Sequence, residues 1–201
     1  MYTKGISISL GIFACFVTNI YALSVLDSTQ SMPEFRNIKW GSLLIEVEEQ
    51  ETERYLQTFS GFGVEALSYK GNIAGLDARI DYTFKSDKFL EGSYTINSSD
   101  SFRNDFQTLL IFLENLYGRP GYSSGKHYKS DSVWTKRNDL ELFRGPSYYW
   151  AFSNGFISLI AEKFKLEITI TILYGYDQTI EEYNSENLIE LKNFNTIRII
   201  K

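Results

Sequence analysis

Two stretches of the chain alternate apolar and polar residues one by one, which is typical of strands with one buried face and one solvent-exposed face. The first covers residues 76–85 and the second covers 90–96, with a turn at 86–87 between them. Similar but less regular patterns predict strands over 64–70 and 164–174. The chain therefore favours an antiparallel sheet.

In two further segments, the apolar residues recur at helical spacing instead of at every second position. Between Phe102 and Leu116, large apolar residues recur three and four positions apart, and Gly118 and Pro120 follow. This pattern predicts a helix that ends near Gly118. A second helix is expected over 43–56, where the interspersed glutamates would form its solvated side.

The dipeptide Asn154-Gly155 predicts a hairpin with a type I′ turn, which pairs Ser153 with Phe156. In that register, one face of the hairpin carries Tyr148, Trp150, Phe152, Ile157, Leu159 and Ala161. The opposite face carries Tyr149, Ala151, Phe156, Ser158 and Ile160. Large apolar residues are therefore expected on both faces of this hairpin.

Residues 1–22 have the layout of a secretory signal peptide. Lys4 precedes an apolar run, and the small residue Ala22 closes a short polar segment. Two alternatives remain open, a retained membrane anchor and a lipid attached to Cys15 after cleavage. We expect a periplasmic or secreted protein that meets the membrane only through this segment. The high content of Ile, Asn, Lys and Tyr is typical of bacteria with AT-rich genomes.

The order of the expected elements divides the remaining chain. After a flexible lead-in over 23–35, a single α+β domain is expected over 36–178, with helices packed on one face of an antiparallel sheet. One helix followed by about three strands occurs twice, in units 36–97 and 99–176. We expect the C-terminal segment 179–201 to pack on this domain.

Two short motifs carry a resemblance to a known family. They are Phe35-x-x-Ile38-x-Trp40-Gly41 with Glu46-Val47 in the first unit, and Leu116-Tyr117-Gly118-Arg119-Pro120 in the second. Together with the order of elements, they resemble the tandem α-β-β-β fold of β-lactamase-inhibitor-like proteins and related envelope-assembly domains. The resemblance implies extracytoplasmic protein binding across an open sheet face. It implies no catalytic residue.

Composition narrows the available chemistry. The 201 residues have a formal net charge of −5, whereas nucleic-acid binding needs a basic surface that displaces counterions, so we expect no such partner. His127 is the only histidine and Cys15 the only cysteine. We therefore expect no metal, no cofactor, and no enzyme that relies on a Ser-His-Asp or Cys-His arrangement.

Charged residues on one face of the expected sheet allow two interpretations. Asp77, Asp81 and Glu91 lie on the same face as Arg79 and Lys85. Paired carboxylates are the machinery of glycoside hydrolysis. Ordinary charge pairing between neighbouring strands explains the same pattern more simply.

The least ordinary feature of the sequence is an apolar patch formed by Tyr149, Phe156 and Ile160. It lies on the face of the hairpin opposite the expected core face, which carries Tyr148, Trp150 and Phe152. Such a patch usually marks a partner or a covering segment, here the C-terminal residues 179–200. We expect these three residues, with Arg79 and Glu91, to bind a partner.

The sequence thus predicts a non-enzymatic protein-binding domain, acting as an inhibitor, immunity factor or envelope accessory on another envelope or secreted protein. Two alternatives remain. One is an extracytoplasmic hydrolase that uses carboxylates alone. The other is a carrier whose cavity, lined by Tyr82, Phe84, Tyr94 and Trp150, holds a small apolar ligand.

Overall fold

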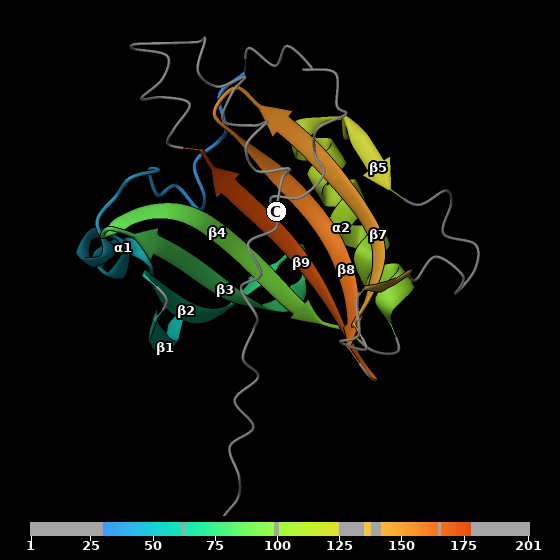
Figure 1. Cartoon of the computed structure of the whole chain (residues 1–201), viewed down its shortest axis with the longest axis horizontal. Helices are drawn as coiled ribbons and strands as arrows, with labels where there is room; N and C mark the ends of the chain where they lie inside the picture. The colour runs from blue at the N-terminus through green and yellow to red at the C-terminus, as the bar shows by residue number, and fades with distance from the viewer. Residues whose placement is uncertain are drawn as a thin grey trace, which may run out of the picture.

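The structure is a computed structural model with one antiparallel sheet and two helices (Figure 1). It describes residues 30–61, 63–98, 101–124, 135–137, 142–164 and 166–177. The α+β class and the antiparallel sheet predicted from the sequence are confirmed. The predictions for the signal peptide, Cys15, His127 and the C-terminal segment lie outside the described residues.

The first half of the chain forms a short helix and a meander of four strands. Positive φ angles at Ala74 and Gly75, and again at Ser86 and Asp87, provide the tight turns between the last three strands. The elements are α1 (Leu44–Gln50), β1 (Arg54–Gly61), β2 (Val64–Ile73), β3 (Leu76–Lys85) and β4 (Lys88–Asn97).

The second half begins with the longer helix and continues with the remaining strands. The elements are α2 (Phe102–Tyr117), β5 (Tyr122–Ser124), β6 (Thr135–Arg137), β7 (Leu142–Phe152), β8 (Gly155–Phe164) and β9 (Glu167–Tyr176). None of the helices in the described ranges combines the length and the apolar character needed to cross a bilayer.

The strands follow the order β1-β2-β3-β4-β9-β8-β7-β5, and β6 also pairs with β7. The last strands of the two halves, β4 and β9, therefore pair with each other in the middle of the sheet. Tyr94 pairs there with Ile172, and Ile96 with Ile170. Strands β1 and β5 form the two edges.

The hydrophobic core lies on one face of this sheet. Strands from both halves contribute fully buried side chains such as Tyr82, Phe84 and Ile157. Helix α2 joins the same core through Phe106, Leu109, Leu110 and Leu113, in agreement with the helical spacing. Trp150 also anchors this helix, because its indole N–H donates to the carbonyl of Gly118 over 2.8 Å.

Residues 30–35, expected as part of a flexible lead-in, are instead tied to the sheet. The backbone N–H of Met32 donates to Oδ1 of Asn154 over 2.7 Å. Phe35 is buried among aromatic rings, and a Cβ at Gly92 would clash with it. The expectation was wrong for these residues because the large apolar side chains of Met32 and Phe35 find a place in the core.

The first helix is shorter than the predicted range of 43–56. It spans only Leu44–Gln50, and its N-cap is Leu43. Glu46 accepts a hydrogen bond from the N–H of Leu43 over 2.8 Å, so a side chain inside the helix satisfies its N-terminus. Glu51 then adopts extended backbone angles, and β1 begins at Arg54.

The second hairpin has the predicted faces but a different turn. Phe152 pairs with Gly155 and Trp150 with Ile157, so the turn is Ser153-Asn154. Neither turn residue has a positive φ, and the predicted type I′ turn was therefore wrong. Each residue of β7 therefore pairs with a residue two positions away from the predicted partner on β8. Because side chains alternate between faces, a shift of two positions leaves each of them on its expected face.

Candidate functional site

The two faces of the sheet differ in chemistry. One carries the hydrophobic core, and we call the opposite one the outer face. The register of β2–β4 and β7–β9 brings polar and apolar side chains together there. Its central residues are Ser68, Asp81, Glu91, Ser93, Tyr149, Phe156, Ser158 and Ile160.

Asp81 is the best-connected acid of the outer face. Its carboxylate accepts hydrogen bonds from the Ser68 hydroxyl at 2.6 Å and from Nε of Arg79 at 2.8 Å. Asp81 is buried, whereas Arg79 remains partly exposed. The carboxylate of Asp81 is thus occupied by a guanidinium group and a hydroxyl donor, as a structural carboxylate would be.

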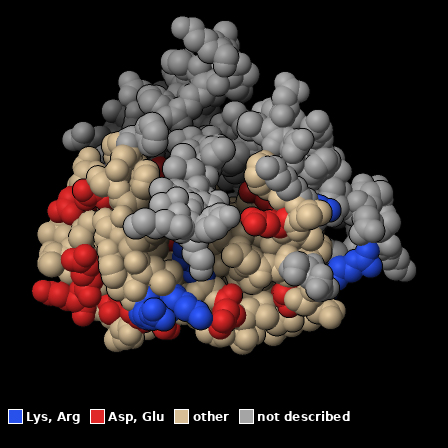
Figure 2. Space-filling model, turned by 90° about the horizontal axis from the view of Figure 1, so that it is seen from below, with Lys and Arg blue, Asp and Glu red and all other residues tan. Residues whose placement is uncertain are grey.

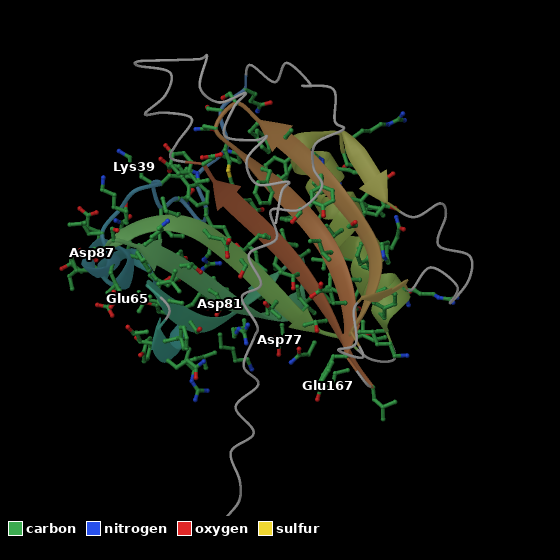
Figure 3. The ribbon with its side chains drawn as sticks, in the orientation of Figure 1. Lys39, Glu65, Asp77, Asp81, Asp87 and Glu167 are labelled. Atoms are coloured by element: carbon green, nitrogen blue, oxygen red, sulfur yellow. The ribbon has the colours of Figure 1, made fainter. Side chains whose placement is uncertain are left out.

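Asp77 lies away from this cluster, near the beginning of β3 (Figure 3). Its carboxylate is 3.6 Å from Nζ of Lys70, and both side chains are largely exposed. An ion pair of this kind contributes little to stability. Asp77 thus pairs with a lysine on the neighbouring strand β2, as the simpler interpretation expected, whereas the partner of Asp81, Arg79, lies on β3 itself.

Glu91 is different, because the described residues provide no hydrogen-bond donor and no cation for its carboxylate. It lies between Thr83 on β3 and Gly175 on β9, diagonally from Asp81. Burial, and secondly the negative charge of Asp81, raise the pKa of Glu91 to about 7. This carboxyl group therefore exchanges protons near neutral pH.

The predicted apolar patch lies on the outer face. Tyr149, Phe156 and Ile160 are half-buried there, while Tyr148 and Trp150 turn toward the core. The ring of Phe156 covers Gly175, where a Cβ would clash with it. Because Gly175 also pairs with Glu91, the aromatic ring and the unpaired carboxylate approach each other across this glycine.

Ser158 lies between the members of the patch. It pairs with Tyr149 on β7 and with Leu173 on β9. Its hydroxyl is fully buried and has no hydrogen-bond partner within the described part of the chain. Such a group carries an unfavourable desolvation free energy that a donor or acceptor from outside would relieve.

The five residues predicted to bind a partner share this face, but they do not form one compact cluster. Glu91 and Phe156 meet at Gly175, and Tyr149 and Ile160 lie around Ser158. Arg79 lies farther away, since the paired residues Thr95 and Thr171 separate it from Ile160. Its guanidinium group is engaged with Asp81.

A second polar cluster, on the core face, was not predicted. Arg36 donates to Glu51 through Nε at 2.9 Å and to Glu53 through a terminal nitrogen at 3.3 Å. The hydroxyl of Tyr82 and the N–H groups of Thr52 and Glu53 also donate to Glu51. The side chain of Glu51 is only 3% exposed, so the expectation that these glutamates form a solvated face was wrong for Glu51.

Electrostatics agree with a structural role for this cluster. Burial alone would raise the pKa of Glu51, but the hydrogen bonds from Arg36 and Tyr82 outweigh it and lower the pKa. Burial and the bond to Glu51 raise the pKa of Tyr82. The only sequence signal was the acid itself, because its partners lie fifteen residues earlier and thirty-one residues later.

Among the described residues, no three His, Cys, Asp or Glu side chains are grouped so that they would hold a metal ion. The chain was also compared with known proteins. No protein-family model matches the chain, and no curated protein does either.

Proposed function

We propose that the protein is a non-enzymatic, extracytoplasmic protein-binding domain whose binding surface is the outer face of the sheet. The observation that carries the proposal is the association of unsatisfied polar groups with a half-buried apolar patch. Beside Phe156, Tyr149 and Ile160, the described residues offer no hydrogen-bond partner to Glu91 or to the hydroxyl of Ser158. A protein surface that supplies donors and apolar area would satisfy both needs at once.

The proposal extends to the architecture. We infer two tandem α-β units, 36–97 and 99–176, with their helices on one face of a shared sheet, similar to β-lactamase-inhibitor-like proteins. The mirrored strand order supports this inference, because β4 and β9 pair centrally and each half continues outward from them. A fold of this kind leaves the other sheet face free for a partner.

The proposed place of action follows from residues 1–22, which have the layout of a signal peptide. The partner would be another envelope or secreted protein, and an inhibitor, immunity factor or envelope accessory would meet it there. The formal charge of −5 gives no support to nucleic-acid binding.

The test is a pull-down from the native envelope fraction with residues 23–201 as bait. The variant Tyr149→Ser/Ile160→Ser should lose a stoichiometric partner that the unchanged bait retains. The matched control is Ile111→Ser/Leu116→Ser, which removes similar apolar area from exposed positions of α2. Circular dichroism must show equal folding of all three proteins. Retention of the partner by the Tyr149 and Ile160 variant would contradict the proposal.

One observation favours a second candidate, a hydrolase that uses carboxylates alone. Glu91 has a pKa of about 7, raised in part by the neighbouring Asp81, and a carboxyl group with a raised pKa beside a second carboxyl group is the arrangement of a glycoside hydrolase. Turnover of chromogenic glycosides that disappears in both Glu91→Gln and Asp81→Asn would support it. The same panel without turnover would leave only the binding proposal.

A carrier of a small apolar ligand has less support. Such a ligand was expected among Tyr82, Tyr94 and neighbouring aromatic residues. The ring of Phe35 fills this region, with its centroid 5.3 Å from that of Tyr82 and 5.1 Å from that of Tyr94.

A further inference from the structure

Strand β1 is unlike the other long strands. Seven of its eight residues are exposed, and only Gly61 is partly buried. It ends the strand order, so in the described part of the chain it has a neighbour on one side only. The opposite edge is formed by β5, which has three residues. The sheet thus presents one long free edge and one short one.

The free edge is apolar and lacks the usual protection. Tyr55, Leu56 and Phe59 are 52%, 43% and 37% exposed. The strand contains no proline, and Arg54 at its beginning is its only charged residue. Natural sheets protect long edges with lysine, proline or a short strand, because unpaired N–H and C=O groups accept another strand. An edge without these features is suited to strand addition.

The surroundings of this edge are acidic. Residues 44–65 contain six glutamates and a single basic residue, Arg54. The ring of Tyr69 lies 5.8 Å from that of Tyr55, and after burial the charges of Glu48 and Glu51 raise the pKa of Tyr69 to about 12. The glutamates at α1 therefore lie close to the first half of β1. Acidic side chains gather on the side of the molecule that carries α1 (Figure 2), where Glu65 also lies (Figure 3).

We propose that the free edge of β1 binds an extended, lysine- or arginine-rich segment of a partner protein as an added strand. Backbone hydrogen bonds to β1 provide affinity, Leu56 and Phe59 contact the apolar residues of the added strand, and the glutamates of α1 select its basic residues. A second copy of this chain fits less well, because its own β1 carries a single basic residue, Arg54, and offers the glutamates no run of lysines or arginines.

Phe59 lies in one row with Glu91 on the outer face, but the patch of Tyr149, Phe156 and Ile160 is on β7 and β8, at the other end of the strand order. The variants that test the two proposals therefore change different strands, and their failures are distinguishable. The probe is a fluorescent peptide of about nine residues that alternates lysine and valine. Its binding to the full chain is followed by anisotropy. Two further peptides serve as comparisons, one with glutamate in place of lysine and one with a central proline. We expect both to bind at least about tenfold more weakly than the lysine peptide.

The variant Leu56→Lys/Phe59→Lys should weaken binding of the lysine peptide at least about tenfold. The control Ile111→Lys/Leu116→Lys adds the same charge on α2 and should leave affinity unchanged, as should Tyr149→Ser/Ile160→Ser. If the β1 double variant fails to fold, Leu56→Lys alone replaces it, because Leu56 is skipped in the pairing with β2.

Three results would overturn the proposal: no binding of the lysine peptide, equal binding of the glutamate peptide, or full binding by the β1 variant. Sedimentation of the full chain provides the remaining outcome. A dimer that dissociates in the β1 variant would identify a second copy as the occupant and reject the basic segment.

Discussion

Glu51 and Glu91 are both at least partly buried, but they differ in the hydrogen-bond donors around their carboxylates. Glu51, on the core face, receives hydrogen bonds from Arg36, Tyr82 and two backbone N–H groups, and its pKa is lowered. Glu91, on the outer face, has no donor among the described residues, and its pKa is raised to about 7. Burial disfavours the charge of both, so their partners account for the difference.

The comparison separates structural polar groups from groups available to a partner. The cluster around Glu51 joins the N-terminal segment, the end of α1 and β3, and its acceptors are already occupied. Among the described residues, the outer face provides no hydrogen-bond partner for the half-buried Glu91 or for the buried hydroxyl of Ser158. A folded protein keeps such groups at a cost in stability, and binding is a physical reason to keep them.

Removal of Glu51 should have the largest effect. In Glu51→Ala, the hydroxyl of Tyr82 loses its acceptor and Arg36 keeps Glu53 but loses Glu51, so we expect the free energy of unfolding to fall by about 3 kcal/mol. Urea denaturation measures the change. The control is Glu49→Ala, at an exposed position of α1 two residues earlier, with an expected change within about 0.5 kcal/mol. Equal changes would show that the cluster does not stabilise the fold.

Replacement of Glu91 should act in the opposite direction and depend on pH. The folded pKa of about 7 exceeds the ordinary value of 4.5, so the folded state binds the proton more strongly and stability falls as pH rises between these values. Glu91→Gln, which never ionises, should therefore be more stable than the natural chain by about 2–3 kcal/mol at pH 8. Below pH 4.5 the two should be equal. Thermal unfolding across this pH range provides the test, and a pH-independent difference would contradict it.

The smallest predicted effect concerns two serines, one with a hydrogen-bond partner and one without a partner among the described residues. Ser158→Ala removes a buried hydroxyl without a partner and should stabilise the protein by about 1 kcal/mol. Ser68→Ala removes a hydroxyl that donates to Asp81 at 2.6 Å and should destabilise it by about 1 kcal/mol. Chemical denaturation of both variants in one buffer measures the signs. Changes of the same sign would mean that the Ser158 hydroxyl has a partner.

Local periodicity was sufficient to predict much of the fold. The alternation over 76–85 gave β3, and the apolar spacing after Phe102 gave α2, because each pattern reflects one buried face of one element. The faces of the hairpin were also predictable, and with them the position of Tyr149, Phe156 and Ile160. A shift of the turn by one residue changed the pairing but not the faces.

The remaining features depend on contacts between distant residues. Strand β1 escaped prediction because the exposed sequence after Arg54 shows no buried face. The burial of Glu51 requires Arg36 and Tyr82, and no local pattern links them. Likewise, the approach of Glu91 to Phe156 exists only because β4 pairs with β9. Sequence patterns predicted which residues share a face, while tertiary pairing determined which of them are neighbours.

The central pairing of β4 with β9 has a consequence for the order in which the protein folds. While the chain is synthesised, β4 is complete at Asn97, but its neighbour begins only at Glu167. At about 5–20 residues per second, the edge of β4 waits roughly 4–14 s for its partner. During that interval the middle of the future sheet is a free edge, open to other chains. The sheet cannot close until its last described strand, β9, has been made.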